Sequence, residues 1–187
     1  MIEMGGSHLV FGTTTDYITG QSLADTHDER IRQQIARFLV EQKGYAKSDI
    51  ESRVPLSLNV DGDTAVAMVD FVIRLENRAF AVIVYGPGSL VSRERAAVAA
   101  ARLIEHYVVP YTVVSNGEDA EVMDTATGKV VGEGPDAVPC RQKALSELEN
   151  MTFQTLDEKR RKKQERILFA MDVLTRRECE SYVCRQC

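Results

Sequence analysis

The sequence feature that most constrains the fold is the segment of residues 79–85, which is nearly all apolar. A short apolar run bounded by turns is typical of a strand that is buried on both faces near the centre of a sheet. Residues 65–74 predict a strand immediately before it, and residues 54–60 alternate apolar and polar side chains ahead of a turn at residues 61–63. We therefore expect three consecutive antiparallel strands.

Two predicted helices flank these strands. Asp25 or Thr26 can cap a helix over residues 27–43, where apolar side chains recur at helical spacing. Residues 90–107 predict a second helix with five alanines, whose small side chains let it lie close on a sheet. Further strands are predicted at residues 110–114, 120–124 and 129–131. The order of helix, three strands, helix, three strands indicates an α+β fold.

The chain divides into four predicted parts. It has 187 residues with 44% apolar ones, enough for one domain with a sizeable core. We expect an arm or short hairpin over residues 1–25, the core over residues 26–135, a helical extension over residues 136–178 and a cysteine-rich tail over residues 179–187. No apolar run reaches the roughly 20 residues of a membrane span, and the start lacks a signal-peptide pattern. The prediction is a cytoplasmic protein that does not contact a membrane.

Charge is divided unevenly along the sequence. The net charge of −5 argues against a generic, charge-driven nucleic-acid binder, but it splits into −8 over residues 1–140 and +3 over residues 141–187. The extension contains helical patterns at residues 142–150 and 153–177. Residues 157–166 of the second lack any apolar side chain and should not face a core. Their basic run is Lys159, Arg160, Arg161, Lys162 and Lys163, and it is either a solvated helix face or a contact for phosphate.

Four segments carry a resemblance to a known family. They are residues 28–30 on the first helix, 43–50 after it, 69–72 on the second strand and 110–117 at the fourth strand and its turn. In these segments the chain resembles the N-terminal domain of type I restriction enzyme R subunits, within the PD-(D/E)xK nuclease superfamily. The resemblance implies a restriction-endonuclease-like core, with a central mixed sheet flanked by helices in an α/β/α arrangement.

The same resemblance implies where a nuclease site would lie. In that family a Glu on the first helix and an Asp on the second strand help to bind Mg²⁺, and the third strand adds Glu-x-Lys. Glu29 and Asp70 match the first two positions, so the resemblance allows Mg²⁺ at Asp70. Val84 and Gly86 stand at the Glu and Lys positions. Neither can replace the chemistry, because valine offers no lone pair to a cation and glycine has no side chain.

Three functional interpretations therefore stay open. The first is a nuclease-like domain that has lost catalysis and binds DNA, another nucleic acid or a protein. The second is a Mg²⁺-dependent DNA endonuclease in which Glu94, at the start of the second helix, has replaced the missing acid beside Asp70 and Glu29. The sequence contains neither a Walker-type loop nor a dinucleotide fingerprint, so it predicts no ATP or NAD site. The oligomeric state is left open.

The third interpretation is a partner-binding protein with a C-terminal metal clasp. Cys179, Cys184 and Cys187 fall within the last nine residues, and Cys140 could join them if the terminal helices fold back. Four thiolates suit tetrahedral Zn²⁺ or an iron-sulfur cluster. The alternative is a tail of reduced cysteines without metal.

Overall fold

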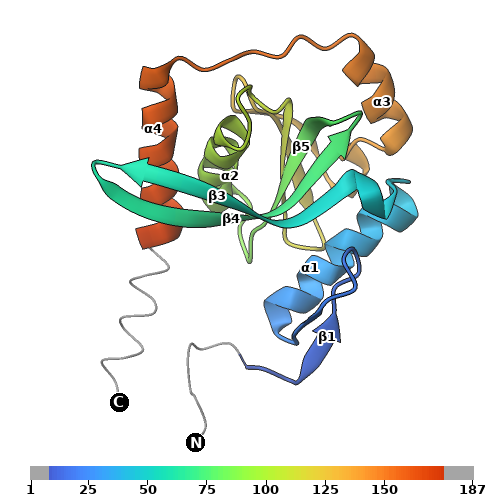
Figure 1. Cartoon of the computed structure of the whole chain (residues 1–187). Helices are drawn as coiled ribbons and strands as arrows, with labels where there is room; N and C mark the ends of the chain where they lie inside the picture. The colour runs from blue at the N-terminus through green and yellow to red at the C-terminus, as the bar shows by residue number, and fades with distance from the viewer. Residues whose placement is uncertain (1–8, 175–187) are drawn as a thin grey trace, which may run out of the picture.

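The computed structural model of the chain describes residues 9–174. A two-stranded hairpin precedes a six-stranded sheet, and helices cover the sheet on both faces (Figure 1). The strands are β1 Thr13–Thr15, β2 Ser22–Ala24, β3 Ile50–Val60, β4 Asp63–Leu75, β5 Arg78–Tyr85, β6 Tyr111–Ser115, β7 Ala120–Asp124 and β8 Lys129–Glu133. The α-helices are α1 His27–Arg37, α2 Val91–Leu103, α3 Arg141–Glu149 and α4 Glu158–Leu168. Short π and 3₁₀ segments are η1 Phe38–Gln42, η2 Lys47–Asp49, η3 Pro135–Ala137 and η4 Phe169–Leu174.

The large sheet is mixed, and its strands follow one another in chain order from β3 to β8. Every neighbouring pair is antiparallel except β5 and β6, which are parallel and joined by α2. A parallel pair needs such a crossover, because the chain must return to the starting edge of the sheet. The carboxyl ends of β5 and β6 therefore meet at one edge, where Gly86 N–H donates to the carbonyl of Ser115.

The core has two main layers because side chains on β5 alternate between the faces of the sheet. Ile83 packs in the cluster that includes Ile35 and Leu39, on the side of α1 and η1. Val82 packs in the cluster formed with α2 and η4. The alanines of α2 are buried all round the helix because α2 lies between the sheet and α4. Burial of these two layers supplies the main favourable free energy of folding.

The predicted α+β core, its mixed sheet and its flanking helices are confirmed. The N-terminal hairpin is also present, as a separate two-stranded sheet packed beside α1 (Figure 1). No helix among residues 9–174 is long and apolar enough to cross a membrane.

Two expectations about the extension were wrong. The helix expected from residue 153 begins only at Glu158, because Phe153 instead packs edge-on against Tyr107 and Gln154 accepts a backbone hydrogen bond from Val108. The polar stretch of residues 157–166 does face the rest of the fold. Gln164 is buried there, and Arg161 reaches the end of α2.

Candidate functional site

The family resemblance directs attention to the carboxyl end of β5. Phe71 on β4 pairs with Ile83 on β5, so the preceding residue Asp70 lies across from Val84. Val84 is half-buried and packs against the cluster beneath α2. The two positions that would supply neighbouring metal ligands in a nuclease therefore carry one carboxylate and one hydrocarbon side chain.

Both oxygens of the Asp70 carboxylate already have donors. Oδ1 accepts a hydrogen bond from Arg32 Nε of α1 at 2.5 Å, and Oδ2 accepts one from the backbone N–H of Tyr85 at 2.8 Å. The Arg32 guanidinium also lies 5.1 Å from the centre of the Tyr85 ring. A guanidinium on this carboxylate supplies the positive charge that a divalent cation would otherwise bring.

The space for the missing lysine is also filled. A Cβ atom built on Gly86 would lie 2.8 Å from Cγ of Arg93 and 3.2 Å from Cγ1 of Val114. The aliphatic part of Arg93, from the first turn of α2, thus covers the backbone where the family has a lysine side chain. A side chain at position 86 would have to displace it.

Glu29 belongs to a different set of contacts. Its Oε1 accepts hydrogen bonds from Gln33 Nε2 at 2.7 Å and from Arg53 at 2.5 Å. Arg53 also pairs with Asp16 at 2.5 Å, and the Asp16 side chain is 1% exposed. Arg53 adopts a φ of 53°, which breaks the regular course of β3 opposite Asp70. Glu29 therefore helps to attach the N-terminal hairpin to α1 and β3.

Glu94 faces Glu121 on β7. Burial and the nearby carboxylate of Glu94 raise the pKa of Glu121 above its ordinary value. Val84 pairs with Val114, which pairs with Glu121, so three strand spacings separate the backbones of Asp70 and Glu121, roughly 14 Å at about 4.8 Å each. Within residues 9–174 no three Asp, Glu, His or Cys side chains form a group that could hold a metal ion.

The side chains at these positions do not form a ligand set for the Mg²⁺ that the resemblance implies. Mg²⁺ requires near-octahedral oxygen ligands at about 2.1 Å, usually including at least one carboxylate that is free to approach it. Asp70 is engaged by Arg32 and Tyr85, and Val84 offers no oxygen.

A comparison of the sequence with known protein families identifies the family of this chain. The family model described as the type I restriction enzyme R protein N terminus (HSDR_N) matches residues 27–139. The chain belongs to this family. Searches of curated proteins and of solved structures find no match. The match runs from the start of α1 to the residue before Cys140, so α3 and α4 lie outside the matched part of this restriction-subunit domain.

The basic residues of α4 have different surroundings. Arg161 donates to the carbonyls of Leu103 at 2.9 Å and Glu105 at 3.1 Å, and so caps the carboxyl end of α2. Arg160 and Lys162 form ion pairs with acidic residues of the first turn of α4 and its cap. Lys159 and Lys163 are exposed. Sequence reasoning treated the run as one patch, whereas the structure gives its members separate roles.

The predicted cysteine clasp is only partly described. Cys140 is exposed and stands just before α3, and it forms no disulfide within residues 9–174. Cys179, Cys184 and Cys187 lie outside the described residues, so the Zn²⁺ or iron-sulfur clasp stays a prediction.

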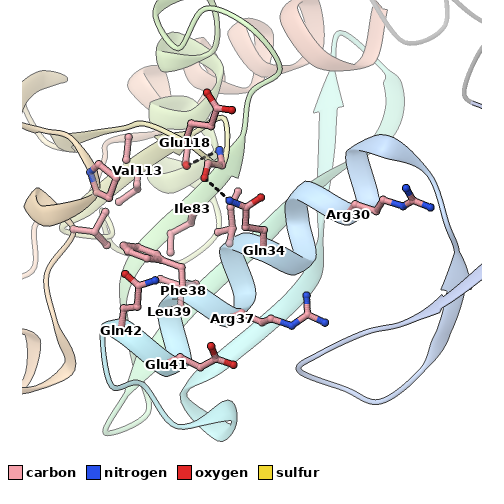
Figure 2. Close-up of a pocket in the computed structure, with 16 residues that line it drawn as sticks. Arg30, Gln34, Arg37, Phe38, Leu39, Glu41, Gln42, Ile83, Val113 and Glu118 are labelled. Carbon is pink, nitrogen blue, oxygen red and sulfur yellow. Dashed lines mark hydrogen bonds between the residues drawn. The ribbon is translucent and has the colours of Figure 1, made fainter.

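A pocket of about 530 Å³ lies between α1, η1 and the β6–β7 turn. Figure 2 shows Phe38, Ile83 and Val113 around its interior, while Arg30 and Arg37 extend from the other side of the helix. Gln34 and Gly117 both line it, and the Gln34 amide donates to the carbonyl of Gly117 at 3.0 Å. No sequence motif marks this pocket, because its walls come from segments far apart in the chain.

Proposed function

We propose that this restriction-subunit domain binds nucleic acid without cutting it. The observation that carries the proposal is the state of Asp70, whose two carboxylate oxygens accept from Arg32 and from the backbone of Tyr85. The match to a restriction-enzyme family supports a nucleic acid as the partner. Binding without cleavage is consistent with both facts.

The absence of two catalytic side chains supports binding without cleavage. Metal-dependent hydrolysis of a phosphodiester needs cations to activate water and to stabilise the negative charge that develops at phosphorus. In this chain Val84 and Gly86 replace the acid and the lysine that would take part, and the side chain of Arg93 covers Gly86. Restoring the site would therefore need at least two substitutions and the release of Asp70 from Arg32.

The alternative of a nuclease with a migrated acid has less support. Glu94 would have to share a cation with Asp70, but its carboxylate interacts with Glu121 instead. The strand register separates Glu121 from Asp70 by three spacings. Glu29, the other acid of the proposed set, is held by Arg53.

Two assays on the full chain test the proposal. Supercoiled plasmid is incubated with the protein and Mg²⁺ or Mn²⁺, and anisotropy of a labelled 20-base-pair duplex reports binding. We expect saturable binding of the duplex and no nicking above that of an Asp70→Asn variant. Nicking that disappears in Asp70→Asn would show that catalysis survives. Absence of binding to duplex, single-stranded DNA and RNA would contradict the nucleic-acid part of the proposal and leave a protein as the partner.

A further inference from the structure

A second cavity lies on the opposite side of the sheet from the pocket of Figure 2. It has a volume of about 340 Å³, is open to solvent, and is lined by residues of α2, α4 and the β7–β8 turn. Its charged lining residues are Arg95, Arg102, Lys163 and Glu94, so the cavity carries a net charge of +2 in a chain of net charge −5. A concentration of cations in an acidic protein raises the local concentration of anions.

Arg102 is a half-buried cation of this cavity whose hydrogen-bond partners are all neutral. Its guanidinium is half-buried, and it donates to the carbonyls of Thr125 and Ala126 at 2.9 Å each and to Gln164 Oε1 at 3.3 Å. All three acceptors are neutral, and within residues 9–174 it forms no ion pair. Desolvation lowers the pKa of Arg102 from its ordinary value, and Asp124 opposes this only in part.

Two other half-buried arginines show the opposite shift in pKa. Arg53 and Arg74 each contact two carboxylates, and these contacts raise the pKa of both despite burial. The Asp124 carboxylate, which acts on Arg102 without forming an ion pair, accepts on Oδ1 from the N–H and hydroxyl of Thr127 at 2.7 and 2.6 Å. A partly desolvated cation without an anionic partner is costly, and a bound anion would remove that cost.

The local backbone leaves the guanidinium open to a ligand. Gly128, in the β7–β8 turn, has a φ of 71°, and a Cβ built on it would lie 3.6 Å from Nη2 of Arg102. Arginine has five N–H donors, and the hydrogen bonds to Thr125, Ala126 and Gln164 use three of them, which leaves two for a ligand. Lys163 and Arg95 approach the same cavity from α4 and α2.

We propose that this cavity is a phosphate-binding subsite in which Arg95, Arg102 and Lys163 hold a phosphate group. The phosphate belongs either to a nucleic-acid backbone or to a free phosphate compound, since both present the same oxygens. The volume lies at the lower end of the range for ligand pockets, about 300–1,000 Å³, and exceeds what one phosphate needs. Val98 and Ile167 line the remaining space with apolar surface suited to an attached sugar. The nucleic-acid form of this inference rests on the proposed function.

The test uses the full chain and two double variants. Arg95→Gln with Lys163→Gln removes two cations from the cavity, and both residues are exposed enough to leave the core intact. Arg78→Gln with Lys143→Gln is the control, because it changes the net charge equally away from the cavity, where it removes the ion pairs with Glu76 and Glu147 and the contact of Arg78 with the Phe153 ring. Inorganic phosphate binding is followed by ³¹P line broadening, and duplex binding by anisotropy at several salt concentrations.

We expect wild type and control to bind phosphate saturably and the cavity variant to lose this binding. Duplex affinity of the cavity variant should fall by about tenfold, and the slope of log affinity against log salt should fall by roughly two. If the variant binds phosphate and duplex as wild type does, the subsite is refuted while nucleic-acid binding stands. If wild type binds phosphate through the cavity but no nucleic acid, the subsite stands for a free phosphate compound and the proposed function falls.

Discussion

Replacing Arg53 by Gln should destabilise the domain strongly, because Arg53 neutralises two carboxylates that are withdrawn from water. The side chains of Asp16 and Glu29 are 1% and 10% exposed, and each contacts the Arg53 guanidinium at 2.5 Å. Removing one partner of a buried ion pair costs about 3–5 kcal/mol. The Arg53 side chain is 32% exposed, so water can replace part of the lost interaction. We therefore expect a loss of about 3 kcal/mol at pH 7, at the lower end of that range.

The loss should depend on pH in a defined direction. Burial alone would raise the pKa of Asp16, but hydrogen bonds from the backbone of Thr19 and from Arg53 outweigh it and hold this pKa below its ordinary value. A lowered pKa contributes stability above the ordinary value near 4, and that stability disappears as the pH falls through the lowered pKa. The difference between wild type and Arg53→Gln should therefore shrink in acid.

Urea unfolding followed by circular dichroism at pH 7 and at acid pH measures this difference. Glutamine suits position 53 because its unbranched Cβ leaves the strain of the left-handed backbone unchanged. Arg166→Gln is the control, since its ion pair with Asp61 is exposed on both sides and should contribute at most about 1 kcal/mol. A loss in Arg53→Gln no greater than the control, or one that grows in acid, would refute the reasoning.

Two further predictions concern single contacts. Burial and the hydrogen bond to Glu147 raise the pKa of Tyr111 to about 12. The contribution of Tyr111 to the free energy of unfolding should therefore be complete below about pH 10 and be lost as the pH rises through about 12. Alkaline urea titrations should show a shallower decline in Tyr111→Phe, and an unchanged slope would contradict this. Gly117→Ala should lower the melting temperature more than Gly62→Ala, because both have positive φ but only a Cβ at 117 would lie 2.6 Å from Ile31. Equal losses would contradict that prediction.

The fold was predictable from the sequence where periodicity determined it. The apolar run that forms β5, the alternation in β3 and the alanines of α2 each report burial directly, so the mixed sheet and its covering helices could be expected. The start of α4 could not, because residues 151–157 contain apolar side chains that pack without forming a helix. Burial of Phe153 against Tyr107 does not distinguish a helix from an extended segment.

Only the loss of two catalytic residues from the candidate site could be predicted from the sequence. Val84 and Gly86 are visible in the sequence once the resemblance aligns them with the acid and the lysine. The partners of the remaining acids are not visible, because Arg32 is 38 residues from Asp70 and contacts it only through the packing of α1 on the sheet. The role of Arg161 as a cap for α2 likewise depends on how α4 packs against α2. Such contacts are fixed by tertiary packing rather than by local pattern.

The central claim is that Asp70 no longer serves a divalent cation, and a Mn²⁺ titration followed by electron paramagnetic resonance tests it most directly. The loss of the free Mn²⁺ signal is compared between wild type and Asp70→Asn at the same protein concentration. Because Arg32 and Tyr85 engage both oxygens of Asp70, we predict identical titrations for the two proteins. One stoichiometric Mn²⁺ in wild type that is lost in Asp70→Asn would contradict the account.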